Sequence, residues 1–229
     1  QQQHLCAEHD RIPKDLYRDF GVMAGLRDEN GKGVLAGLTN ISDIRAFQYV
    51  DGVKKPADGQ LLYRGYDVKD LIRGSSGSRF AFEEAGYLLL FGELPTQEKL
   101  DEFCRVLGEC RYFRAYIYLC LVTRFGDVPV LRQNTQAKVS RDPASMAWEL
   151  VEEDLDAASG FLNGLSADSF YYVSPAAVTA LKARVKLYLG KKGEAKELAE
   201  SLIANPNYAL DDFDKIFRSK ANKEVIFAF

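Results

Sequence analysis

The chain has 229 residues, a formal net charge of −3 and 47% hydrophobic residues. This length predicts one large domain or two small ones, and the composition is that of a folded globular protein, which excludes a disordered, collagen-like or coiled-coil chain. Thirty basic residues stand against 33 acidic ones, so no cationic surplus is available to neutralise a phosphate backbone. Nucleic acid is therefore not an expected partner.

No segment of the sequence predicts a transmembrane helix. The longest nearly uncharged apolar run, residues 115–123, is bracketed by Arg114 and Arg124 and is far shorter than the roughly 20 residues that a spanning helix needs. The chain opens with Gln1 and has neither an apolar leader nor a small residue before Cys6. We therefore expect a mature start or a fragment, and no lipoprotein processing site at Cys6.

The N-terminal third of the sequence predicts a small antiparallel β element. Residues 44–50 alternate loosely between apolar and polar side chains, and residues 61–63 provide a returning strand. Between them, Asp51-Gly52 is a dipeptide typical of the type I′ hairpin turn. A further strand-like piece is expected upstream, at residues 34–39.

Apolar residues spaced by three and four predict helices over much of the remaining chain. Short helices are expected at residues 68–72 and 80–91, the second of them buried. A long helix is expected to begin after Thr96, and its apolar spacing, broken only at Gly108, continues up to Cys120. The cysteines form no CxxC pair and are expected to be reduced thiols in helices; they are Cys6, Cys104, Cys110 and Cys120.

Two further helix starts carry a capping residue followed by proline. Asp142-Pro143 predicts a carboxylate N-cap for the helix that carries Trp148, and Ser174-Pro175 repeats the signal. The second start opens a helical hairpin of about the length of a tetratricopeptide unit, whose short connection at residues 190–193 forces its helices antiparallel. Because one such unit cannot bury both of its faces, the Trp148 helix is expected to pack against it.

Residues that usually carry catalysis or bind metals are sparse. The two histidines, His4 and His9, both lie in the first ten residues, where chains commonly fray. Cys6-x-x-His9 supplies half of a metal site, but no second Cys or His pair completes it, so an incidental helix face is preferred. The glycine-rich stretch 74–79 lacks a P-loop ending and is interpreted as a surface loop. We predict no catalytic residue, no metal and no cofactor.

Aromatic residues supply the remaining binding candidates, because their faces stack on sugars and bases. The aromatic residues at 112–118, with Phe125 after them, lie in a segment that is apolar on most sides, so core packing is preferred for them. Trp148 and the aromatic run that contains Tyr171 and Tyr172 are expected to be more exposed. Trp148, Tyr171 and Tyr172 are therefore the predicted ligand-stacking residues.

Two groups of motifs each resemble a known family. The first extends over roughly residues 5–107 and includes 10–13, 25–28, 62–71 and the helix-and-turn stretch 82–96. In this order the motifs resemble the N-terminal region of citrate synthase. The resemblance implies a cytoplasmic acyltransferase of the tricarboxylic acid cycle that condenses acetyl-CoA with oxaloacetate. The catalytic histidines and aspartate of that family lie beyond the matched part, so no catalytic residue is carried over.

From about residue 109 the motifs resemble those of the SusD/RagB-like glycan-binding lipoproteins of the outer membrane. Residues 111–118 and 125–130 match the RAYYY...GDVP signature of that family, and four later blocks also match: 154–158, 174–177, 183–188 and 224–227. The resemblance implies tetratricopeptide-like helix pairs, a glycan partner and the outer-membrane surface. No binding residue of the family can be carried over to this chain.

These observations predict a mainly α chain, with N-terminal helices and a small antiparallel β element followed by C-terminal tetratricopeptide-like helical hairpins. We expect a citrate-synthase-like fragment at residues 1–107 and a SusD/RagB-like helical fragment at residues 108–229, joined near residues 105–110. Because the two resemblances imply different cellular compartments, the cytoplasm and the outer-membrane surface, the cellular location is left open. Each fragment lacks neighbours for its apolar faces, so exposed hydrophobic patches and self-association are expected.

Two functions follow from this organisation. The preferred one is a non-catalytic, chimera-like chain whose second half resembles a glycan-binding scaffold for nutrient uptake. The alternative is a citrate-synthase-like acyltransferase of which this chain supplies only the non-catalytic N-terminal part.

Overall fold

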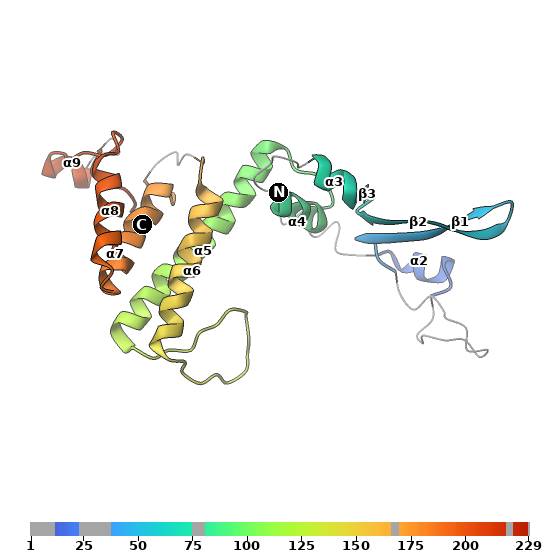
Figure 1. Cartoon of the computed structure of the whole chain (residues 1–229), viewed down its shortest axis with the longest axis horizontal. Helices are drawn as coiled ribbons and strands as arrows, with labels where there is room; N and C mark the ends of the chain where they lie inside the picture. The colour runs from blue at the N-terminus through green and yellow to red at the C-terminus, as the bar shows by residue number, and fades with distance from the viewer. Residues whose placement is uncertain (1–11, 23–37, 75–80, 166–169, 219–221, 229) are drawn as a thin grey trace. The chain divides into compact units, whose positions relative to one another are not determined.

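A computed structural model of the chain describes residues 12–22, 38–74, 81–165, 170–218 and 222–228 (Figure 1). As predicted, the chain is mainly helical with a small antiparallel sheet. It divides into two compact units, Gln1–Leu100 and Asp101–Phe229. The strand expected at residues 34–39 falls mostly outside the described residues, as do the loop at 75–79 and the residues His4, Cys6 and His9.

The first unit contains a β-hairpin that confirms the predicted strands and turn. Strand β1 (Ser42–Val50) pairs antiparallel with β2 (Val53–Tyr63), and the short strand β3 (Tyr66–Asp67) pairs with the end of β2. Asp51 and Gly52 have φ angles of 53° and 75°, the two positive values that a type I′ turn requires. The register of the two strands shifts between Arg45 and Phe47.

Among its described residues, the first unit also contains helices α2 (Lys14–Asp19), α3 (Val68–Gly74) and α4 (Ala81–Phe91). Helix α3 confirms the short helix expected after residue 67. The expectation that α4 is a buried helix is wrong for part of its surface, since Phe82 and Leu90 are 84% and 53% exposed. Its buried face consists of Tyr87, Leu88 and Phe91, which lie at the three- and four-residue spacing of one helix stripe.

The second unit is built from α5 (Gln97–Phe125), which begins just before the boundary between the units, α6 (Ala144–Leu162), α7 (Pro175–Tyr188), α8 (Lys192–Ile203) and α9 (Phe213–Arg218). Its hydrophobic core contains buried side chains of α5, α6 and α7. Gly108 lies inside α5, where the absence of a side chain leaves room for Leu162. A Cβ atom at Gly108 would lie 2.6 Å from Cγ of Leu162.

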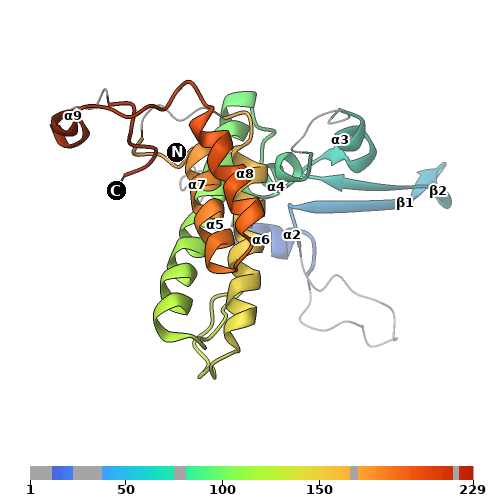
Figure 2. The same cartoon turned by 60° about the vertical axis from the view of Figure 1, so that its left-hand side comes forward.

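The helical hairpin of α7 and α8 confirms the tetratricopeptide-like pair. Ser174 is the N-cap of α7, and its hydroxyl accepts a hydrogen bond of 3.1 Å from the Ala177 N–H, with proline at the start of the helix. The pair is closed by Gly190 at a φ of 73°. Figures 1 and 2 show α7 and α8 side by side, with α6 next to them, so the Trp148 helix is the expected neighbour.

The predicted cap of α6 is wrong. The helix begins after Pro143 without a side-chain cap from Asp142. Instead the Asp142 carboxylate accepts a hydrogen bond of 2.8 Å from the Val130 N–H, and Asp127 accepts one of 2.9 Å from the Ala144 N–H. The free N–H at the helix start is thus satisfied by a residue 17 positions earlier, which a local capping rule does not consider.

Candidate functional site: a groove along α5 and α7

The predicted stacking residues lie in two places. Trp148, near the start of α6, is partly buried and packs with its ring centroid 6.0 Å from that of Tyr188, at the end of α7. Tyr171 and Tyr172 precede the start of α7 and are 51% and 49% exposed. Because the 14 residues of α7 span about 20 Å, the structure does not bring Trp148 together with these two tyrosines.

Two adjoining pockets follow α5 and α7. The larger has a volume of about 520 Å³ and the smaller about 350 Å³, and Tyr116 and Arg184 line both. We call the two pockets together the α5–α7 groove. Their volumes are in the range of ligand pockets, roughly 300 to 1,000 Å³.

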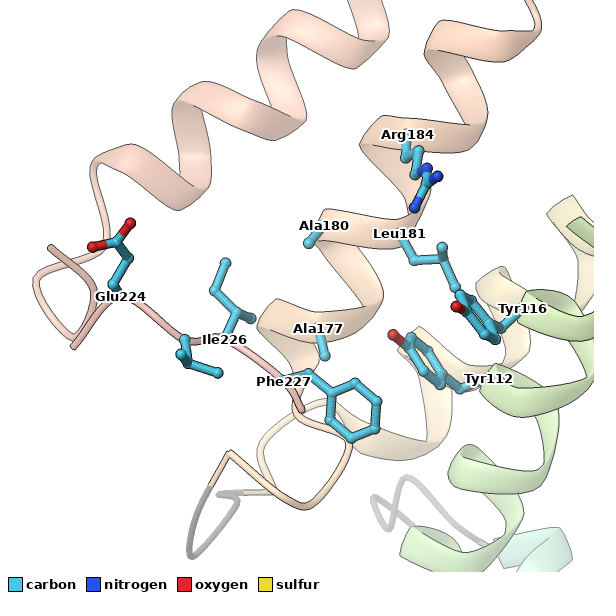
Figure 3. Close-up of a pocket in the computed structure, with 10 residues that line it drawn as sticks. Tyr112, Tyr116, Ala177, Ala180, Leu181, Arg184, Glu224, Ile226 and Phe227 are labelled. Atoms are coloured by element: carbon cyan, nitrogen blue, oxygen red, sulfur yellow. The ribbon is translucent and has the colours of Figure 1, made fainter. Parts of the chain in front are cut away.

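Helix periodicity places the groove residues on facing stripes. Tyr112 and Tyr116 are one turn apart on α5, and Cys120 and Arg124 continue the same stripe toward the helix end. On α7, Ala177, Ala180, Leu181, Arg184 and Tyr188 share a face by the same rule. Figure 3 shows Tyr112 and Tyr116 projecting toward α7, where the small side chains of Ala177 and Ala180 leave space.

The C-terminal segment forms a third wall of the larger pocket. The Phe227 ring lies edge-on to Tyr112, with ring centroids 5.5 Å apart (Figure 3). The Ala228 N–H donates a hydrogen bond of 2.9 Å to the Phe170 carbonyl, which holds this segment against the chain before α7. Glu224 lines the same pocket, and its carboxylate accepts a hydrogen bond of 3.0 Å from the Asp211 N–H.

The Tyr112 hydroxyl is a neutral polar group inside the groove. Burial, with a smaller contribution from Tyr116, raises the pKa of Tyr112 to about 12, so the phenol keeps its proton at physiological pH. Within the described residues this hydroxyl has no hydrogen-bond partner, although only 6% of the residue is exposed. It can therefore donate a hydrogen bond to a ligand.

Two arginines line the smaller pocket without a partner. Arg124 lies in the last turn of α5 and Arg184 lies on α7, and both are exposed. In the part of the chain that the structure describes, neither makes a hydrogen bond or an ion pair. The groove thus combines aromatic faces, a free hydroxyl and two uncompensated cations.

A separate cluster of charges beside the groove has a structural role. Asp154 of α6 is fully buried and pairs with two arginines of α5, at 2.8 Å to Arg111 and 2.5 Å to Arg114. The hydrogen bond to Asp154 is the main cause that raises the pKa of Arg114. These groups satisfy one another and link α5 to α6, so they are not available to a ligand.

Reasoning from the sequence found only part of this site. Core packing is confirmed for Tyr112 and Tyr118, which are 6% and 7% exposed, and is wrong for Phe125, which is 68% exposed. A tyrosine in the core can still present its hydroxyl to a pocket, and apolar periodicity does not reveal this. The sequence feature that could have indicated the pocket is the pair of small residues Ala177 and Ala180 on α7, which lie opposite the tyrosine stripe of α5.

The described ranges contain neither a membrane-spanning helix nor a metal-binding cluster. There, no helix is long and apolar enough to cross a membrane. No group of three or more His, Cys, Asp or Glu side chains in the same ranges could hold a metal ion. Of the cysteines expected to be reduced thiols in helices, Cys104, Cys110 and Cys120 lie in α5 with reduced thiols.

Solved structures similar to the chain are SusD-like. B. fragilis NanU is 28% identical with a TM-score of 0.52, covering 67% of this chain and 33% of that one. A laminarin-binding SusD-like protein is 25% identical with a TM-score of 0.52, and the match covers 68% of this chain and 37% of that one. A SusD superfamily protein from Bacteroides vulgatus, at 24% identity and a TM-score of 0.52, shows the fold alone.

Curated proteins with similar sequences are citrate synthases and related proteins. The citrate synthase of Haloferax volcanii is 40% identical over 89 residues, which are 39% of this chain and 20% of that protein. A citrate synthase-related protein of Dictyostelium discoideum is 46% identical over 55 residues, which are 24% of this chain and 12% of that protein. 2-Methylcitrate synthase 1 of Corynebacterium glutamicum is 42% identical over 71 residues, which are 31% of this chain and 15% of that protein. The chain spans a fifth or less of the length of these relatives.

A family model gives the family of the chain. The model described as citrate synthase, C-terminal domain, matches residues 25–146. This range begins before the hairpin, extends past the junction predicted at residues 105–110 and ends in α6. Since it covers more than half of the chain, the chain belongs to the citrate synthase family.

Proposed function

We propose that the chain is a non-catalytic, chimera-like binding protein whose second unit binds a glycan in the α5–α7 groove. The observation that carries this proposal is the lining of the groove. Sugar rings have apolar faces that pack on aromatic side chains, and hydroxyls that exchange hydrogen bonds with polar groups. Tyr112 and Tyr116 offer both features in a pocket of about 520 Å³, and the Tyr112 hydroxyl has no partner within the described residues.

The residues predicted to stack on a ligand extend this proposal. Trp148 packs on Tyr188, which lines the smaller pocket, so a longer glycan that leaves the groove would pass the Trp148 ring. At the other end of α7, the exposed Tyr171 forms a ring pair with the partly buried Phe170, with centroids 4.5 Å apart. We assign Tyr171 and Tyr172 to a second, weaker contact with the same glycan.

The origin of the two halves is part of the proposal. We propose a citrate-synthase-like piece at residues 1–107 and a SusD/RagB-like piece at residues 108–229, joined near 105–110. The two kinds of similar protein and the unit boundary at Leu100 support this division. A laminarin-binding protein among the solved structures supports a glycan partner. The place of action proposed for such a scaffold is the outer-membrane surface.

A glycan array probed with the full chain tests this function. We expect binding to at least one oligosaccharide, and a tenfold or greater loss of affinity for Tyr116→Ala, because Tyr116 lines both pockets. Tyr49→Ala is the matched control, since Tyr49 is an exposed tyrosine of β1 outside the groove. Circular dichroism shows whether each variant is folded. An array without any binding would contradict the proposal.

Family membership favours a second candidate function. The residues matched by the family model would form the non-catalytic part of an acyltransferase that condenses acetyl-CoA with oxaloacetate, and another chain would supply the catalytic residues. An assay for free CoA tests the non-catalytic proposal. We expect no turnover by this chain alone, and turnover would contradict the non-catalytic proposal.

We also propose that the chain self-associates through exposed apolar side chains. Phe82, Ile203 and Leu210 are 84%, 82% and 91% exposed, and exposed apolar groups of this size favour association. Sedimentation velocity at increasing concentration tests the proposal. A growing fraction of larger species is expected, and a single monomeric species at high concentration would contradict it.

A further inference from the structure

Resting on the proposed function, we infer that the α5–α7 groove selects glycans with a carboxylate, such as a uronic acid, and that Arg124 and Arg184 bind this carboxylate. Both guanidinium groups line the smaller pocket of about 350 Å³. A guanidinium matches a carboxylate in shape and charge, because its N–H groups form a planar fork that can donate two parallel hydrogen bonds.

The other arginines of this region show why these two stand out. Arg111 and Arg114 bind the buried Asp154, and Arg132 binds Glu153 at 2.6 Å. The unit therefore neutralises the arginines that hold its helices together. Arg124 and Arg184 line one pocket with no such partner in the described ranges, and an anionic ligand would supply the missing negative charge.

The charge along the groove also gives the ligand an orientation. Arg184 of α7 and Glu224 of the C-terminal segment lie apart in the larger pocket, and Tyr112 and Phe227 lie along its lower side in Figure 3. A carboxylate near Glu224 would meet a like charge, whereas the same group near Arg184 meets an opposite one. The acidic sugar therefore lies at the arginine end, and neutral sugars lie along the aromatic wall.

Calorimetric titration of the full chain with a matched pair of sugars tests this selectivity. The probes are an oligogalacturonate trimer and the same trimer with its carboxylates reduced to alcohols. We expect the acidic trimer to bind at least tenfold more tightly, and the preference to shrink at high salt because screening weakens exposed charge pairs. Free acetate serves as a third probe, and it is expected to bind at least tenfold more weakly than the acidic trimer.

Variants connect the preference to the two arginines. Arg124→Ala and Arg184→Ala are each expected to remove most of the preference for the acidic trimer and to leave affinity for the reduced trimer within about twofold. Lys196→Ala is the matched control, because Lys196 is an exposed cation of α8 outside the groove. It removes the same charge and should leave the preference intact.

Cysteine alkylation provides a readout at the site itself. Cys120 lines the smaller pocket, whereas Cys110 is exposed on the same helix and outside both pockets. The acidic trimer should slow alkylation of Cys120 and leave the rate at Cys110 unchanged, as measured by peptide mass spectrometry. Slowing at both cysteines alike would contradict binding in the groove.

The outcomes distinguish failure of the inference from failure of the proposed function. Equal affinity for the two trimers, or a preference that survives both arginine variants, overturns the acidic selectivity and leaves glycan binding in place. Absence of binding by either trimer, together with an array without any binding, overturns the proposed function and the selectivity that rests on it. A preference lost in both arginine variants, with protection of Cys120 alone, supports the inference.

Discussion

The two units of the chain differ in how much apolar surface they bury. The second unit encloses a core of side chains from three long helices and links α5 to α6 through the buried Asp154. Within the described residues, the first unit buries few large side chains: Leu62, Tyr87, Leu88, Phe91 and Leu100. Because apolar burial is the main source of folding free energy, we expect the second unit to be the more stable one.

The same difference separates the roles of the two units. The β1–β2 hairpin exposes most side chains on both faces, Ile44 and Tyr49 among them, so it has regular hydrogen bonding without a core of its own. The second unit has a core large enough to hold a groove in fixed shape. A preorganised site needs such support, since side chains that line it must keep their rotamers.

The largest expected effect comes from core truncation in each unit. Leu88→Ala in α4 and Leu155→Ala in α6 both remove side chains that are at most 1% exposed, and each should cost about 2 to 5 kcal/mol. If the units unfold separately, Leu88→Ala lowers only the transition of the first unit and Leu155→Ala only that of the second. Calorimetry combined with hydrogen exchange measures both. A variant that shifts both transitions equally would show one cooperative fold.

Removing the buried carboxylate should have the next largest effect. Asp154→Ala leaves Arg111 and Arg114 without their anion, and the lost charge-assisted hydrogen bonds are expected to cost the second unit about 3 kcal/mol. Glu153→Gln is the neighbouring control, since its pair with Arg132 is exposed and exposed ion pairs contribute little to stability. Urea unfolding compares the two. Similar losses in both variants would contradict the structural role of Asp154.

A glycine in each unit tests local packing. Gly108→Ala places a Cβ 2.6 Å from Leu162 Cγ, and this overpacking should cost about 1 to 3 kcal/mol, offset in part by the better helix propensity of alanine. Gly86→Ala in α4 meets nothing within 4 Å and should stabilise the first unit by up to about 1 kcal/mol. Thermal unfolding measures whether each of the two variants is destabilised or stabilised. Stabilisation by Gly108→Ala would show that Leu162 moves aside at no cost.

The smallest expected effect is a pH dependence from Glu152. Burial alone would raise the pKa of Glu152, but hydrogen bonds from Lys186 and Lys191 lower it below its ordinary 4.5. A lowered folded pKa contributes stability above the unfolded value, and this is lost as pH falls through the folded value. Glu152→Gln should therefore destabilise the second unit by about 1 kcal/mol at pH 7 and by less at pH 3. An equal loss at both pH values would contradict the ion-pair explanation.

Local patterns predicted much of the fold and little of the site. The hairpin turn and the Ser174 cap depend on residues close in sequence, so turn and capping rules found them. The start of α6 depends on Asp127, which is distant in sequence, and the local rule named Asp142 instead. The groove needs α5, α7 and the C-terminal segment together, and helix periodicity alone places none of these elements beside another.

Hydrogen exchange of the full chain with and without the acidic trimer tests the central claim, that the second unit carries the binding site. The account predicts slower exchange in peptides that cover residues 112–124 and 177–188, with no change in residues 42–91. Slower exchange in residues 42–91, with none along α5 and α7, would contradict it.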